Sequence, residues 1–174
     1  MGEGPHSHDK RTSTVWNGTD FDCTVDSGDV SKLSHPAVML PAFSDGDGGS
    51  AVSRKIGLAT GVDLAAPRKS GEMSGTMKEF TILHSRPGAP YKHVLVLGCG
   101  SRDKFRLDDL RSIVAKGVRT LRKIGVDSML LAAASFPQFS CEDVAEAAVE
   151  GALLGLHKFK RYAKKTDPVR PFRQ

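Results

Sequence analysis

A glycine turn between an apolar strand and an amphipathic helix constrains the fold of this chain more than any other feature. Residues 93–100 read HVLVLGCG, an apolar run that ends in two glycines. The spacing of apolar residues predicts a helix over 108–124. A strand over 128–133 and a helix that begins after Ser140 are predicted to follow. Strands and helices that alternate in this way are typical of an α/β fold.

The helix predicted over 108–124 has a core face and a basic face. Three cationic residues, Lys116, Arg119 and Lys123, lie together on the face opposite the core. Gly125 is a natural C-terminal stop for the helix. The expected core residues recur every three or four positions: Leu110, Ile113, Val114, Gly117, Val118, Leu121 and Ile124.

The first half of the chain gives weaker signals of the same kind. Strands are predicted over 21–25, 37–43 and 79–84, and a short helix over 50–60. The run AVMLPAF over 37–43 is apolar throughout, as in a strand that is covered on both faces. Pro41 within this run implies a strand end or a bulge, because proline donates no ladder hydrogen bond.

Composition and length favour one soluble domain. The chain has 174 residues, of which 39% are hydrophobic, and this length suits one domain with its own core. It contains neither an apolar run long enough for a membrane span nor a secretory signal, so we expect a cytoplasmic protein with no membrane partner. Cys23, Cys99 and Cys141 lie far apart and are interpreted as reduced thiols. Residues 1–20 are expected to be a disordered leader or a non-native remnant, in which His6 and His8 form an incidental H-x-H pair.

The net charge of +5 comes from the end of the chain. Residues 158–174 hold seven basic side chains and one acidic side chain, a net of 7 − 1 = +6, which leaves −1 for the other 157 residues. A basic segment of this kind attracts phosphate groups. A solvated linker is the commoner explanation for such a run, and it is the one we favour.

The glycine turn resembles the start of a dinucleotide-binding fingerprint. Gly98, Gly100, Ser101 and Arg102 are therefore candidate nucleotide-loop residues. Asp103 places a negative charge where the third glycine belongs, and the following helix begins too late for the fingerprint. A turn with a purely structural role is the favoured interpretation.

No catalytic or metal-binding constellation emerges from the residues. Cys99 at the glycine turn could be a low-pKa nucleophile, but its nearest histidine, His93, lies at the other end of the same strand. An ordinary buried cysteine is the better interpretation. His84 and His157 show no spacing typical of a catalytic triad or a metal site. We therefore expect neither catalytic nor metal-ligating residues in this chain.

Three consecutive phrases carry a family resemblance: VLVLGCGSRDKF, DDLRSIVAKGVRTLRKIGVDSMLL and AEAAVEGALLGLHKFKRY. Together they resemble the N-terminal domain of the leucyl (cytosol) aminopeptidase family, which characteristically carries an E-G-x-x-L-G segment, here at 150–155. The resemblance covers about 21–167 and is strong after His93. The segment 50–76 looks short for the family, and Arg106 stands where a serine or threonine helix cap is usual.

The resemblance implies a macro-domain-like three-layer fold with a mixed, largely parallel sheet flanked by helices. It implies a domain over 21–160 and a basic linker over 161–174 toward a catalytic domain that is absent here. In this family the N-terminal domain is non-catalytic, and two divalent metals, zinc or manganese, bind in the C-terminal domain. The implied partners are that catalytic domain and the other subunits of a homohexamer, and no cofactor is expected in this chain.

Two binding functions remain open beside this one. Lys116, Arg119 and Lys123, together with the basic end of the chain, could contact DNA phosphates. A solvated helix face is the commoner explanation for such a stripe. The glycine turn at 98–102 could instead form a macro-type pocket for ADP-ribose or a related nucleotide.

Overall fold

The computed structural model describes residues 10–16, 19–25, 29–46 and 50–157. The expected leader residues 1–9, including His6 and His8, and the basic segment 158–174 lie outside the described residues. No helix among the described residues is long and apolar enough to cross a membrane.

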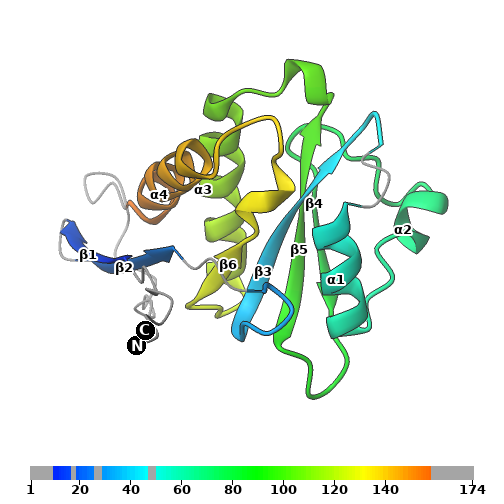
Figure 1. The fold of residues 1–174 in the computed structure, drawn as a ribbon, viewed down its shortest axis with the longest axis horizontal. Helices are drawn as coiled ribbons and strands as arrows, with labels where there is room; N and C mark the ends of the chain where they lie inside the picture. Colours follow the sequence, from blue (N-terminus) through cyan, green and yellow to red (C-terminus); the bar gives the residue numbers. More distant parts are fainter. Residues whose placement is uncertain (1–9, 17–18, 26–28, 47–49, 158–174) are drawn as a thin grey trace, which may run out of the picture.

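A four-stranded mixed sheet forms the centre of the fold, in the order β4-β5-β3-β6 (Figure 1). β3 (His35–Phe43) runs parallel to β5 (Tyr91–Gly100) and to β6 (Met129–Leu131). β4 (Phe80–His84) pairs antiparallel with β5. The mixed, largely parallel sheet that the family resemblance implies is therefore confirmed.

Helices cover both faces of this sheet (Figure 1). α3 (Leu107–Lys123) and α4 (Cys141–Leu156) pack on one face. α1 (Ala51–Thr60) lies on the other face, and the short α2 (Ala66–Lys69) follows it. Alternate side chains of β3 and β5 enter the two cores, as the period of two in a strand requires. Two cores on either side of one sheet explain why the run at 37–43 is apolar throughout.

Local sequence signals set the ends of α1 and α4. The Ser50 hydroxyl accepts a hydrogen bond from the Ser53 amide at 3.1 Å, which caps the first turn of α1. Gly61 ends α1 in the left-handed region, with φ of 72°. The Ser140 hydroxyl accepts from the Asp143 amide at 3.1 Å, so the predicted cap of α4 is confirmed.

α3 agrees with the predicted helix except at its ends. The expected core positions from Leu110 to Leu121 are buried, but Ile124 is 46% exposed because the helix ends at Lys123. Arg106 occupies the N-cap position noted in the sequence. Its guanidinium group carries no acceptor for a helix amide, and instead the Arg106 amide donates to the Asp109 carboxylate at 3.0 Å.

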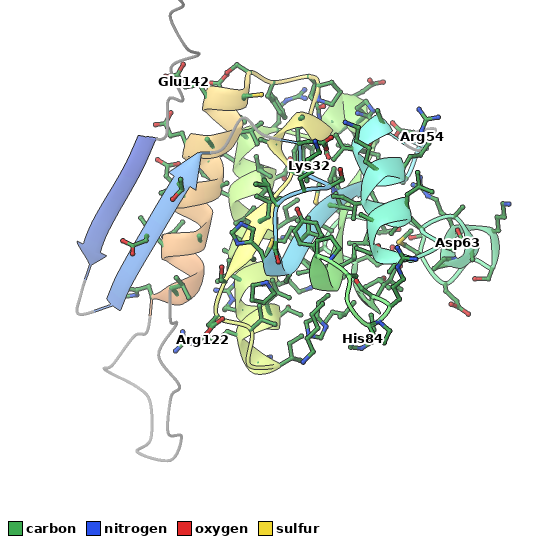
Figure 2. The ribbon with its side chains drawn as sticks, turned by 60° about the horizontal axis from the view of Figure 1, so that its bottom comes forward. Lys32, Arg54, Asp63, His84, Arg122 and Glu142 are labelled. Carbon is green, nitrogen blue, oxygen red and sulfur yellow. The ribbon has the colours of Figure 1, made fainter. Side chains whose placement is uncertain are left out.

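Two expectations about regular structure differ from the structure. The strand expected over 128–133 is shorter, because Ala133–Ser135 forms a 3₁₀ turn, η2, one residue after the end of β6. A strand, β1 (Lys10–Trp16), pairs antiparallel with β2 (Thr19–Val25), where no regular structure was expected before residue 21. This hairpin forms a separate two-stranded sheet beside α4 (Figures 1 and 2).

Candidate functional site

The glycine turn at the end of β5 is closed by a neighbouring segment of the chain. We call residues 74–79 the strap. A β-carbon on Gly98 would lie 2.0 Å from the Thr76 carbonyl oxygen, so only glycine allows the strap to lie this close. The Gly98 amide donates to the Glu79 carbonyl at 2.7 Å, and the Gly100 amide donates to the Gly75 carbonyl at 2.8 Å. The strap thus covers the turn with backbone hydrogen bonds.

A carboxylate and an ammonium group hold the strap in shape. The Glu79 carboxylate accepts hydrogen bonds from the Ser74 hydroxyl at 2.8 Å and from the Thr76 amide at 3.2 Å. These bonds, with the Ser74 hydroxyl foremost, hold the pKa of Glu79 below its ordinary value. Lys78 has a φ of 68°, a conformation that is strained for a residue with a side chain. Its carbonyl accepts from the Lys116 ammonium at 2.9 Å.

A second carboxylate binds the turn where a phosphate group would be expected. Asp45 Oδ2 accepts from the Arg102 amide at 2.8 Å and from the Ser101 hydroxyl at 3.3 Å. The Arg102 amide is the main cause of the lowered pKa of Asp45. The Arg102 guanidinium carbon lies 4.1 Å from the centre of the Phe43 ring. The candidate nucleotide-loop residues therefore lie at one end of the sheet. Two of them already have partners there: Asp45 binds Ser101 and Arg102, and the Phe43 ring lies against the Arg102 guanidinium group.

The predicted basic face is present on α3, and its three cations have different surroundings. Lys116, Arg119 and Lys123 are all exposed. Lys116 binds the Lys78 carbonyl, and its ammonium nitrogen lies 4.4 Å from the centre of the Phe80 ring. Lys116 therefore braces the strap, whereas Arg119 and Lys123 extend the stripe toward the end of the helix.

Cys99 occupies the position of a buried core residue. It is fully buried, and its thiol donates to the Leu97 carbonyl at 3.3 Å. Cys23 and Cys141 are free cysteines. Among the residues that the structure describes, no group of three or more histidine, cysteine or acidic residues is placed to hold a metal ion.

One histidine pair was not anticipated from the sequence. The register of β4 and β5 sets His84 directly opposite His93, and their ring centroids lie 5.0 Å apart. His93 is only 8% exposed, and its Nδ1 atom has no hydrogen-bond partner among the described residues. Burial, followed by the charges of His84 and Lys92, lowers the pKa of His93. The turn that joins β4 and β5 indicated that the two strands pair, but it did not show the register that sets His84 opposite His93.

The family is decided by a match over most of the chain. Residues 42–166 match the model of the cytosol aminopeptidase family, N-terminal domain. The chain belongs to this family. A probable cytosol aminopeptidase from Solibacter usitatus is 32% identical over 139 residues, which cover 80% of this chain and 26% of the relative. The chain thus spans about a quarter of this cytosol aminopeptidase.

Solved structures confirm the macro-domain-like fold. A tomato leucine aminopeptidase aligns with a TM-score of 0.62 at 16% identity, over 80% of this chain and 29% of that chain. A macrodomain from Oceanobacillus iheyensis aligns with a TM-score of 0.61 at 14% identity, over 87% of this chain and 83% of that chain. The cytosol aminopeptidase N-terminal domain and the macrodomain therefore share one fold at low sequence identity.

Proposed function

We propose that this chain is the non-catalytic N-terminal domain of a metal-dependent leucyl aminopeptidase, an enzyme that releases N-terminal amino acids from peptides. The observation that carries the proposal is the match of residues 42–166 to the N-terminal domain of the family. The relative from Solibacter usitatus is about four times as long as the matched region, which leaves room for a catalytic domain. The domain spans 21–160, and residues 161–174 form the linker toward that catalytic part.

The hydrogen bonds that two carboxylates accept within the domain support a structural role for it. Asp45 and Glu79 lie beside the glycine turn, and both accept hydrogen bonds from backbone amides. A carboxylate held ionised by amides is a poor general acid, because a catalytic acid needs a pKa near the working pH. Both groups instead fix the loops at the end of β5.

In the whole enzyme the domain serves assembly of a homohexamer and shapes access to the active sites in the cytoplasm. Two divalent metals, zinc or manganese, bind in the catalytic domain and supply the activated water for peptide hydrolysis. The proposal is tested by incubating the purified chain with leucine amide and added manganese or zinc. No turnover is expected, and turnover that co-purifies with the chain through successive columns would overturn it.

DNA binding through the basic face is the second candidate function. Arg119 and Lys123 favour it, because both are exposed at successive turns on one side of α3. Such cations bind phosphate by releasing counterions from the nucleic acid. A nucleotide site at the glycine turn is less favoured, since Asp45 already engages Ser101 and the Arg102 amide.

A further inference from the structure

Two imidazole rings face each other across the pair of strands at the edge of the sheet. His84 on β4 is the direct register partner of His93 on β5, and both lie on the face covered by α3, as do their neighbours Ile82 and Leu95. Direct cross-strand partners are the nearest side-chain neighbours in a sheet. The ring centroids are 5.0 Å apart and the ring planes meet at 71°.

The two rings differ in their contact with solvent. His84 is exposed and is the last residue of β4 (Figure 2 labels it). His93 is 92% buried, and its Nδ1 atom meets neither a donor nor an acceptor among the described residues. A buried ring nitrogen without a partner is uncommon, because most buried polar atoms are hydrogen-bonded. A bound cation would supply the missing partner, and the exposed ring leaves solvent access to it.

We propose that His84 and His93 together bind one divalent transition-metal cation, with water completing its coordination. Neutral imidazole is a favoured ligand for zinc, nickel and copper ions. Zinc–nitrogen bonds measure about 2.0–2.1 Å, so two rings with centroids 5.0 Å apart can share one ion after a small rotation of the exposed ring.

The chemistry of His93 agrees with this assignment. Burial, His84 and Lys92 all lower its pKa, so the ring is neutral at physiological pH and ready to bind a metal. Lys92 extends from the opposite face of β5, because neighbouring residues in a strand alternate between faces. His35 shares the face of His93 but lies two register positions away on β3, since its own partner is Tyr91. A substitution of His35 therefore serves as the matched control for a substitution of His84.

The test is a zinc titration followed by nuclear magnetic resonance of the histidine ring nitrogens in the full 174-residue chain. His6→Asn and His8→Asn are introduced first, because that H-x-H pair can bind zinc independently. The His84 and His93 signals are expected to shift together and to saturate at one zinc per chain. The proposal is overturned if neither signal moves, or if only one of them does.

Two substitutions separate a shared site from binding to single rings. His84→Asn removes an exposed ligand and leaves the core intact, and it is expected to weaken zinc binding at His93 at least about tenfold. His35→Asn is expected to leave the affinity unchanged. An unchanged affinity at His93 in the His84→Asn variant would contradict a shared ion.

Discussion

Gly151 on α4 lies against the backbone of Arg111 on α3, with no space for a side chain between them. A β-carbon at Gly151 would lie 2.5 Å from the Arg111 carbonyl oxygen. One turn further, a β-carbon at Gly155 would lie 2.5 Å from the Ala115 carbonyl oxygen. The E-G-x-x-L-G segment noted in the sequence is therefore the contact surface between the two helices. Arg111 and Glu150 form an ion pair beside it.

Gly151→Ala is expected to destabilise the domain. The new methyl group meets rigid backbone, and overpacking of this kind costs about 1–3 kcal/mol. Gly117→Ala is the matched control, because its β-carbon would meet the flexible end of the Met39 side chain at 2.9 Å. Chemical denaturation of both variants should show the larger loss at Gly151. An equal or smaller loss there would contradict the packing described for α3 and α4.

Lys78→Gly is expected to stabilise the strap. Glycine adopts a φ of 68° without the steric cost that a side chain imposes, although its freedom in the unfolded chain offsets part of the gain. The net effect should be a gain of up to about 1 kcal/mol in the free energy of unfolding. Lys104→Gly, in the 3₁₀ turn η1 (Arg102–Lys104), is the control and should give no gain. Destabilisation by Lys78→Gly would refute strain at this position.

Glu79 is expected to make stability depend on acidity. Its pKa is lowered from 4.5 in the fold, so its contribution is complete above that value and is lost as the pH falls through the folded pKa. Glu79→Gln should lower the melting temperature at pH 7 and change it little at pH 3. Thermal melts at both pH values measure this. Equal losses of melting temperature at pH 7 and pH 3 would show that the charge on the Glu79 carboxylate does not contribute to stability.

His93 is expected to make stability depend on pH in a higher range than Glu79 does. Its pKa is lowered from 6.5, so the unfolded chain takes up a proton before the folded domain does. Stability should therefore fall as the pH drops from 7.5 to 5.5. His93→Asn should flatten this part of the melting profile, whereas His35→Asn should leave the slope as it is. A slope that persists in the His93→Asn variant would assign the dependence to other groups.

The basic face of α3 can be tested for nucleic-acid binding without disturbing the strap. If it binds DNA, charge reversal at Arg119 and Lys123 should abolish a salt-dependent gel shift. Lys116 is left intact because it binds the Lys78 carbonyl. A shift that survives charge reversal would assign DNA binding to another part of the chain.

Local patterns were sufficient to predict the regular elements of the second half of the chain. The helical period placed α3 within one residue at each end, and Ser140 marked the start of α4. Ile124 was wrongly assigned to the core, because it lies one residue beyond the end of α3 and its side chain is exposed. Gly125 follows Ile124 with a φ of 79°, in the left-handed region, so the helix does not continue past this point.

The arrangement around the glycine turn could not be predicted from local patterns. Asp45 lies in the turn that follows β3, more than fifty residues before the glycine turn. The strap comes from a segment with several helix- and strand-breaking residues and no period of apolar residues. The cross-strand pairing of His84 and His93 depends on register, which is set by the whole sheet. Asp103 and the late start of the helix argued against a dinucleotide fingerprint, but they gave no indication that Asp45 binds at the glycine turn.

The most direct test of the central claim is a comparison of peptidase rates. The purified chain and the full-length aminopeptidase of Solibacter usitatus would be assayed together on leucine amide, with manganese or zinc added to both. A non-catalytic domain should hydrolyse no faster than buffer, whereas enzymes exceed the uncatalysed rate by about 10⁶-fold or more. A rate for this chain that approaches that of the full-length enzyme, and that follows the chain through purification, would contradict the assignment as a non-catalytic domain.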